Sequence, residues 1–225
     1  MYQTYLDREP VIITAALTGG VHGKEANPNI PETPAEIGRA AGACEDAGAA
    51  IVHVHARTRE GERTFETERF QAIDEEIRAH TDDIIIQHST GGTGVPLETR
   101  RLPLRTDPAP EMASLDMGPL NRYQHITSEN TRGMIDALAE EMADRDIKPE
   151  LEVFNPGHMN EVYSLLERRD MDEPVYATLI FGSGTLTIPS PDNFLNMIQN
   201  LPEGAKFNTL GFGPHQLPFA GMGII

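Results

Sequence analysis

The sequence predicts an α/β fold whose parallel strands close into a barrel, with a helix after each strand. Short apolar runs alternate with helical segments along all 225 residues, and this alternation is typical of parallel sheets covered by helices. Several runs carry polar residues at every second position, which favours a barrel with an inward polar face over an open sheet. The predicted fold is therefore a TIM (β/α)8 barrel. Because only seven strands are found, we expect a sequence truncated after strand seven, or a chain that continues past Ile225.

The predicted strands are compact runs rich in β-branched and other apolar residues, mostly followed by turns that contain Gly or Pro. The run VIITAAL, for example, ends at Thr18, Gly19 and Gly20. The seven strands are expected at residues 11–17, 51–57, 83–89, 111–116, 148–154, 175–182 and 205–212.

The first predicted helix has a strong start signal. In the sequence TPAE at residues 33–36, Thr33 is the expected N-cap, Pro34 occupies the first helical position, and Glu36 completes a capping box. The helix should end before Gly48. Further helices are expected at residues 66–79, 97–104, 127–145, 160–169, 191–200 and 216–225, within a single domain that spans residues 1–225.

The charge balance restricts the possible partners. The chain has 35 acidic and 18 basic residues, for a net charge of −17, so it should repel nucleic acids and anionic membranes. Only three of the basic residues are lysines. An acidic, Lys-poor surface is expected where high salt screens self-repulsion, so we hypothesise a halophilic source; an ordinary acidic cytosolic protein is the alternative.

The location predicted from sequence is the cytoplasm. No apolar run is long enough to span a membrane, and residues 1–10 lack the apolar segment of a signal peptide. The single cysteine, Cys44, excludes an intrachain disulfide and fits a reducing compartment.

The strand at residues 51–57 (IVHVHAR) carries the strongest functional signal. Its period of two places His53, His55 and Arg57 on one face and apolar residues on the other. Two imidazoles at this spacing can converge on one metal ion, and Arg57 can then meet an anion or an acid near it. A pair of structural histidines is the alternative, and the same motif occurs in unrelated zinc hydrolases.

Two loops after strands supply further candidates. The Ser-Thr-Gly-Gly loop that begins with Ser89 and Thr90 and includes Gly92 offers hydroxyl and N–H groups that suit an anion, although Gly clusters also form plain turns. His88 should face away from this site by alternation. In the loop after the first strand, His22 is a possible substrate contact, or simply a surface histidine.

The strand at residues 148–154 places two acids, Glu150 and Glu152, on one face. A carboxylate inside a barrel is costly unless it has a metal, a cation or a substrate as its partner. Because Glu152 lies nearer the carboxyl end of its strand, we expect it to take part in catalysis or in the polar network of the site.

Several sequence segments resemble the β-keto acid cleavage enzymes, a family that includes the 3-keto-5-aminohexanoate cleavage enzyme of lysine fermentation. The segments are VIITAALTGG, AGAAIVHVHAR, IIIQHSTGG and PEMASLDMGPLN, together with Pro-Asn-Ile-Pro at residues 28–31. They occur in family order over residues 11–213. The resemblance implies a zinc-dependent TIM barrel, usually a homotetramer, that converts a β-keto acid and acetyl-CoA into acetoacetate and a new CoA thioester.

The resemblance also implies roles for individual residues. His53 and His55 match the family's zinc ligands, and Glu152 matches an inward acid. The family's third ligand, a Glu on the last strand near a catalytic Arg and Asp, has no counterpart in this sequence, so we expect these 225 residues alone to bind zinc weakly and to be inactive. Ser89, Gly92 and Ser114 match substrate-contacting positions, and the loop that contains residues 182–184 is expected to admit the thioester arm.

One position departs from the lysine-fermentation enzyme. Where that enzyme has a Glu that binds the substrate's amino group, this chain has Val21, followed by His22. The expected β-keto acid therefore has a neutral or apolar tail, or a polar tail that reaches His22. There are two alternatives to this function. The protein could be another metal-dependent barrel enzyme, an aldolase or a hydrolase, or a non-catalytic ligand-binding barrel.

Overall fold

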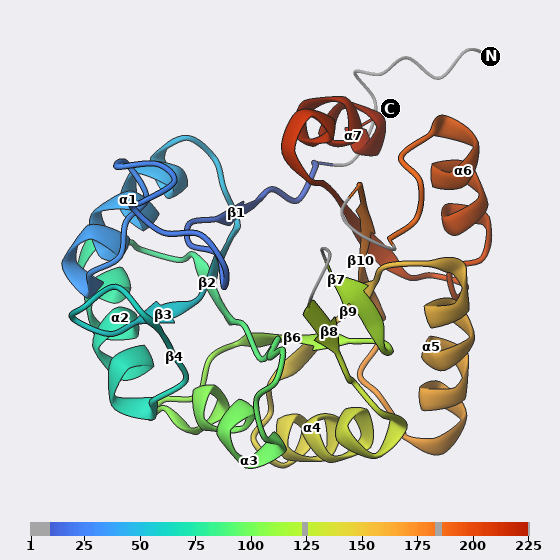
Figure 1. Cartoon of the computed structure of the whole chain (residues 1–225), viewed down its shortest axis with the longest axis horizontal. Coiled ribbons are helices and arrows are strands. Elements are labelled where there is room, and N and C mark those ends of the chain that lie inside the picture. Colours follow the sequence, from blue (N-terminus) through green and yellow to red (C-terminus); the bar gives the residue numbers. More distant parts are fainter. Residues whose placement is uncertain (1–9, 123–125, 183–185, 225) are drawn as a thin grey trace.

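A computed structural model of the chain describes residues 10–122, 126–182 and 186–224. Its strands form one seven-stranded parallel sheet in the order β1-β2-β5-β6-β9-β10-β11, which curves into a nearly closed barrel with the helices outside (Figure 1). The predicted barrel is confirmed through its seventh strand. The strands are β1 (Thr14–Ala16), β2 (Ile51–Val54), β5 (Ile85–His88), β6 (Met112–Asp116), β9 (Lys148–Val153), β10 (Tyr176–Phe181) and β11 (Lys206–Gly211).

The helices lie between consecutive strands, as predicted. The capping box of the first helix is confirmed, because Thr33 Oγ1 accepts a hydrogen bond from the Glu36 N–H and the Glu36 carboxylate accepts one from the Thr33 N–H. The helices are α1 (Pro34–Asp46), α2 (Thr67–His80), α3 (Leu97–Arg100) with the 3-10 helix Leu102–Arg105, α4 (Arg132–Asp144), α5 (Pro156–Arg168), α6 (Pro191–Gln199) and α7 (Gln216–Ile224).

The region before α4 differs from the prediction. Residues 127–131 are not helical; instead β7 (Leu120–Arg122) and β8 (Ile126–Ser128) pair as an antiparallel ribbon. Thr131 caps α4 by accepting from the Met134 N–H, so the helix begins at the next residue. Helix α5 begins earlier than predicted, because the Asn155 side chain caps it.

The predicted strand at residues 51–57 is also divided. Strand β2 ends at Val54, and β3 (Ala56–Arg57) pairs with β4 (Arg63–Thr64) outside the main sheet. The cause is the Thr18 hydroxyl, which accepts from the His55 N–H at 2.7 Å and donates to the His55 carbonyl at 2.9 Å. These bonds replace the ladder bonds that His55 would make in a continuous strand.

The first strand is shorter than the apolar run that predicted it. Val11, Ile12 and Ile13 precede β1 and are 50%, 43% and 50% exposed. Strand β1 has a neighbour on one side only, since β2 pairs with it and β11 stands at the other end of the sheet order. Within the described residues, no strand pairs with the second side of β1, and Val11, Ile12 and Ile13 line the cavity between β1, β11 and α7.

The outer face of β2 is buried under helices, as its alternation predicted. Val52, Val54 and Ala56 pack with Ile37 of α1 and Phe70 of α2. The inner face begins with an apolar layer at the amino ends of the strands, formed by Ile51, Ile85, Met112 and Tyr176. Polar residues adjoin this layer, because Glu150 is the register partner of Tyr176 and Thr14 is the register partner of Ile51.

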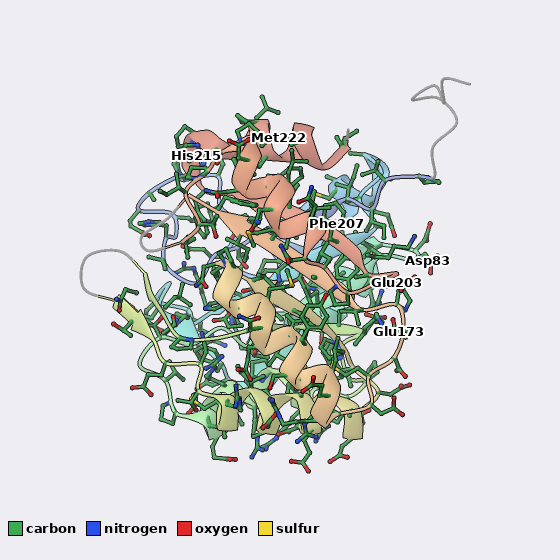
Figure 2. The ribbon with its side chains drawn as sticks, turned by 90° about the vertical axis from the view of Figure 1, so that its right-hand side faces the viewer. Asp83, Glu173, Glu203, Phe207, His215 and Met222 are labelled. Atoms are coloured by element: carbon green, nitrogen blue, oxygen red, sulfur yellow. The ribbon has the colours of Figure 1, made fainter. Side chains whose placement is uncertain are left out.

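The two ends of the barrel differ in what they expose. Figure 2 shows Asp83, Glu173 and Glu203, which precede β5, β10 and β11, on one side of the molecule. His215, which follows β11, lies on the opposite side. No helix in the described part of the chain is long and apolar enough to cross a membrane.

Candidate active site

The two predicted metal ligands face each other inside the barrel. His53 Nε2 and His55 Nε2 are 3.3 Å apart, and their rings meet at an angle of 66°. His53 Nδ1 lies 2.7 Å from Gln87 Oε1. Because an amide oxygen only accepts hydrogen bonds, this contact puts the ring proton on Nδ1 and leaves a lone pair on His53 Nε2, directed at His55.

A cavity of about 730 Å³ opens above the histidine pair at the carboxyl ends of the strands. One wall is apolar and contains Phe154, Ile180, Leu186, Leu210 and Phe212. The polar and charged side chains on the remaining lining are Thr18, His22, His53, His55, Arg63, Ser89, Thr93, Asp116 and Glu152. In parallel barrels this end carries the active site.

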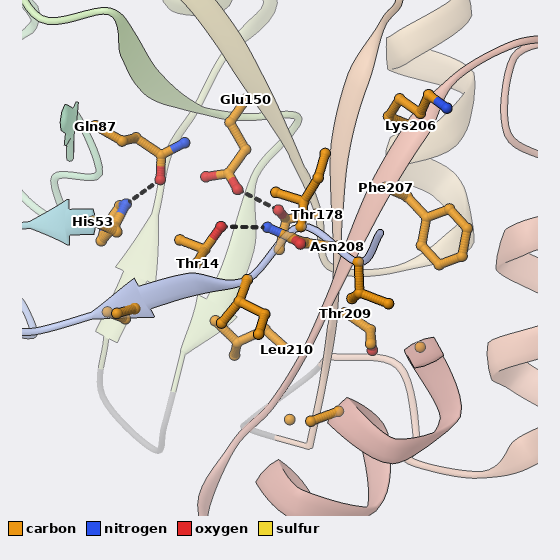
Figure 3. A pocket seen from close by; sticks show the side chains of 18 of the residues that line it. Thr14, His53, Gln87, Glu150, Thr178, Lys206, Phe207, Asn208, Thr209 and Leu210 are labelled. Atoms are coloured by element: carbon orange, nitrogen blue, oxygen red, sulfur yellow. Dashed lines mark hydrogen bonds between the residues drawn. The ribbon is translucent and has the colours of Figure 1, made fainter. Parts of the chain in front are cut away.

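A second cavity, of about 970 Å³, lies between β1, β11 and α7. His53 and Glu152 line both cavities. Figure 3 shows its inner wall, where His53, Gln87, Glu150 and Thr178 follow one another. The histidine pair is therefore reached from the mouth of the barrel, and His53 also borders the space between the two edge strands.

The Ser-Thr-Gly-Gly loop reaches the mouth cavity mainly through Ser89, whose hydroxyl accepts from the Gly91 N–H. Thr90 and Ser114 are buried behind it: the Thr90 N–H donates to Ser114 Oγ, and the Thr90 hydroxyl donates to the Ser114 carbonyl at 2.6 Å. Gly92 packs on the Arg100 side chain, which leaves no room for a Cβ. The structure brings only Ser89 of these four predicted contacts to the cavity lining, and the substrate contacts of the other three remain predictions.

Arg57 lies outside the lining of both cavities. Its buried guanidinium donates to the carbonyls of Gly19, His22 and Gly61, and Glu32 lies 3.9 Å away. These contacts hold the loop after β1, so Arg57 positions this loop in the described structure. Its predicted catalytic role remains a prediction.

That loop brings two side chains to the rim of the mouth cavity. His22 and Val21 both line it, and Val21 is 49% exposed. The predicted possible contact, His22, is therefore available to a bound molecule. The thioester-arm prediction concerns residues 182–184, and residues 183–185 lie outside the described part of the chain.

Two acids lie on the inner side of neighbouring strands at the mouth. Glu152, which was predicted, is opposite Asp116 in the register of β6 and β9, and both line the cavity. Asn130 Nδ2 donates to Asp116 Oδ2 at 3.0 Å. Asp116 was missed from sequence, although its alternation with Ser114 on one strand is a signal that could have identified it.

Glu150 is buried one step deeper, with 3% of its surface exposed. The Thr178 hydroxyl donates to its carboxylate. Burial raises the pKa of Glu150, opposed by the nearby His53 and by the side chains of Thr178, Gln87 and Asn208. Burial, and after it the Glu150 charge, raises the pKa of Tyr176 to about 12.

Comparison with known proteins identifies the family of this chain. Residues 10–225 match the profile of the family described as beta-keto acid cleavage enzyme. The chain belongs to the β-keto acid cleavage enzymes. It is 35% identical over 218 residues to the 3-keto-5-aminohexanoate cleavage enzyme of Acetoanaerobium sticklandii, covering 96% of this chain and 79% of that protein.

Other relatives of this β-keto acid cleavage enzyme are named for different substrates. The 3-oxoadipate:acetyl-CoA acetyltransferase of Cupriavidus necator is 30% identical over 217 residues, covering 94% of this chain and 75% of that protein. A solved structure, the ternary complex of ObcA with a C4-CoA adduct and oxalate, superposes with a TM-score of 0.72 at 20% identity, over 88% of this chain and 55% of that one. This last likeness supports the fold alone.

A metal ion bound at the histidine pair would have two imidazole donors within the described residues. His53 and His55 present facing ring nitrogens, but the described part of the chain holds no group of three or more His, Cys, Asp or Glu side chains arranged for a metal. The spacing of the pair fits one ion, because two ligands of a tetrahedral Zn²⁺ at about 2.0–2.1 Å lie about 3.3 Å from each other. The residues present therefore fit two of the ligands that zinc needs.

Proposed function

We propose that this protein is a zinc-dependent β-keto acid cleavage enzyme. It takes a β-keto acid and acetyl-CoA and gives acetoacetate and a new acyl-CoA. The acyl group of the β-keto acid moves to the sulfur of CoA, and its carboxymethyl carbon becomes bonded to the acetyl group. One C–C bond and the acetyl C–S bond break, and one C–C bond and one acyl C–S bond form. The observation that carries this proposal is the pair of facing Nε2 atoms at the base of the mouth cavity.

His53 and His55 would hold the zinc ion, which when bound supplies Lewis-acid polarisation of the keto and carboxylate oxygens. The hydroxyl of Ser89 is positioned to donate to the substrate carboxylate at the same wall of the cavity. The apolar wall around Phe154, Leu210 and Phe212 excludes water from the reacting carbons and accommodates an apolar tail. Arg57 keeps the loop with Val21 and His22 in place above the pair.

The polarity of the rim supports the substrate class. Val21 offers no charge to an ammonium group, whereas His22 offers a hydrogen-bonding ring. A β-keto acid with a neutral or apolar tail, or with a polar tail that reaches His22, fits this lining. A cytoplasmic homotetramer is the associated proposal for location and assembly, following the family resemblance.

A panel of β-keto acids tests the function, with new CoA esters as the measured product. Each acid is incubated with Zn²⁺ and the protein, with and without acetyl-CoA. Two proteins are compared: the 225 residues of this chain and the longest product of the gene that contains it. We expect acetyl-CoA-dependent turnover of at least one acid by the longer product. Loss of the acid without acetyl-CoA would favour an aldolase or hydrolase. Binding of an acid without turnover by the longest gene product would favour a ligand-binding barrel.

A further inference from the structure

Three polar side chains, one from each of three strands, follow one another inside the barrel and begin with His53 of the histidine pair (Figure 3). His53 of β2 and Gln87 of β5 are direct neighbours in the sheet register, and Glu150 comes from β9. Gln87 is completely buried, and its carbonyl oxygen contacts His53 Nδ1 at 2.7 Å. The other end of the Gln87 amide is turned toward the Glu150 carboxylate (Figure 3).

The orientation of the Gln87 amide decides the tautomer of His53. With its oxygen toward the ring, the amide requires a proton on Nδ1; with its NH₂ group toward the ring, it requires a lone pair there. Only the first arrangement leaves the lone pair on Nε2, the atom 3.3 Å from His55 Nε2. The imidazole alone can pair with either end of the amide, so His53 by itself does not select one of these arrangements.

A charged neighbour removes this ambiguity. Burial raises the pKa of Glu150, but His53 and the side chains of Thr178, Gln87 and Asn208 act in the opposite direction and favour its ionised form. In that form the carboxylate only accepts hydrogen bonds, so it favours the NH₂ end of an amide and repels the oxygen end. Gln87 Nε2 is buried, and no hydrogen bond to it is formed among the described residues. The Gln87 side chain is nevertheless close enough to Glu150 to favour the ionised form of its carboxyl group. Glu150 is held in turn by the hydroxyl of Thr178 on β10.

We propose that Glu150, acting through the Gln87 amide, is a positioning residue that keeps the lone pair of His53 on Nε2, where a metal shared with His55 would bind. In metalloproteins a ligand histidine usually donates its second ring N–H to a carbonyl or carboxylate, which fixes the ring and strengthens the ligand. Here Gln87 is the direct partner and Glu150 orients that partner. The inference rests on the proposed function only in the identity of the metal.

The tautomer is measured in the metal-free protein, at alkaline pH where the imidazoles are neutral, by long-range ¹H–¹⁵N correlation spectra of histidine-labelled samples. We expect wild-type His53 to carry its proton on Nδ1. Gln87→Met, which removes the acceptor at similar volume, should move the proton to Nε2 or give a mixture. Glu150→Leu should do the same although the substituted side chain would not touch the ring, whereas Glu150→Gln, which can still accept from Gln87, should stay closer to the wild type.

Zinc affinity, measured by competition with a chromophoric chelator, is the second readout. Loss of such an outer partner typically costs about 10–100-fold in metal affinity, and we expect this range for Gln87→Met and for Glu150→Leu. If Glu150 acts through Gln87, the double variant Gln87→Met/Glu150→Leu should bind zinc no more weakly than Gln87→Met alone. Independent, additive losses would contradict the relay.

Thr187→Val is the matched control. Thr187 is buried, donates to the Phe154 carbonyl and lines neither cavity, so this variant should keep both the His53 tautomer and the zinc affinity. Thermal unfolding of each metal-free variant shows whether the fold is kept, and Glu150→Gln remains informative if Glu150→Leu does not fold. Failure of the wild type to bind zinc would count against the proposed function, while the His53 spectra would still decide the relay. The proposal is overturned if wild-type His53 carries its proton on Nε2, or if Glu150→Leu lowers only the unfolding temperature.

Discussion

His53 and His55 approach within 3.3 Å through their Nε2 atoms, although only His53 belongs to a strand of the barrel. The Thr18 hydroxyl holds the backbone of His55 just beyond the end of β2. The two rings therefore meet although the backbone of His53 is held by the sheet and that of His55 by the Thr18 side chain.

Replacing His53 should remove zinc binding. The prediction concerns the full-length protein, since these 225 residues alone are expected to bind zinc weakly. With His53→Ala, one imidazole of the pair remains, which should not be enough to retain the ion. Metal content after dialysis against trace zinc measures this. His80→Ala is the control, because His80 lies on the surface of α2 and should leave the content unchanged. Unchanged zinc in the His53 variant would exclude the pair as the metal site.

Val21→Glu should extend the substrate range to β-keto acids that carry an ammonium group. Val21 lines the rim of the mouth cavity, and a carboxylate there would form a charge-assisted hydrogen bond worth about 1.5–3 kcal/mol, or about 10–100-fold. The ratio of kcat/KM values for 3-keto-5-aminohexanoate and an uncharged analogue, in the active form of the protein, reports the change. An unchanged ratio would show that the substrate tail points elsewhere.

Arg100→Met should destabilise the protein and loosen the loop that begins with Ser89. Buried Arg100 donates to the Thr90 carbonyl at 2.7 Å and to Asn130 Oδ1 at 2.8 Å, and Asn130 in turn holds Asp116. Since bonds from a charged group are lost in the interior, the free energy of unfolding should fall by about 2–4 kcal/mol. Urea unfolding measures it.

The neighbouring Arg101→Met is the matched control for that variant. Arg101 is partly exposed and pairs with the exposed Glu98 and with Glu141. Because solvent still reaches Arg101, we expect a smaller loss, about 0–1 kcal/mol. If the free energy of unfolding falls equally in the two variants, the buried hydrogen bonds of Arg100 do not stabilise the protein more than the ion pairs of Arg101.

The capping box of α1 should contribute an acid-sensitive part of the stability. Hydrogen bonds from Lys24 and from the N–H groups of Thr33 and Glu32 lower the pKa of Glu36 from 4.5 to about 2. A carboxyl whose pKa is depressed by folding stabilises the protein above its unfolded pKa, and this stabilisation is lost as the pH falls from 4.5 towards 2. Glu36→Gln should therefore flatten the pH dependence of the unfolding temperature in this window. An identical slope in both proteins would contradict the assignment.

Salt should stabilise the protein if its acidic surface is an adaptation to high salt. A net charge of −17 repels itself, and molar salt screens this repulsion. The unfolding temperature should rise between about 0.1 M and about 1 M NaCl at neutral pH, because the Debye length falls from about 10 Å to about 3 Å over this range. Near pH 4.8, the isoelectric point, the effect should shrink. Stability that does not depend on salt would end the halophilic hypothesis.

The sequence determined the fold class and half of the site because both follow from local periodicity. Alternation with a period of two set His53 and His55 against Val52 and Val54, and the structure confirms that separation of faces. The same alternation predicted that His88 faces away from the site. In the structure His88 is buried on the other face of its strand, against Asp74 and the Pro103 carbonyl. These results depend only on which side of a strand each residue occupies.

Contacts between distant segments decided the rest. The break after Val54 comes from a threonine 37 positions before His55, and the guanidinium of Arg57 is taken by carbonyls of a loop more than thirty residues away. Neither effect leaves a local pattern, since a side-chain hydrogen bond overrides the strand preference only once the chain has folded. The sequence by itself therefore determined the strands, their faces and the histidine pair, while only the tertiary structure decided that Gln87 and Glu150 lie behind His53 and that Asp116 joins Glu152 at the mouth.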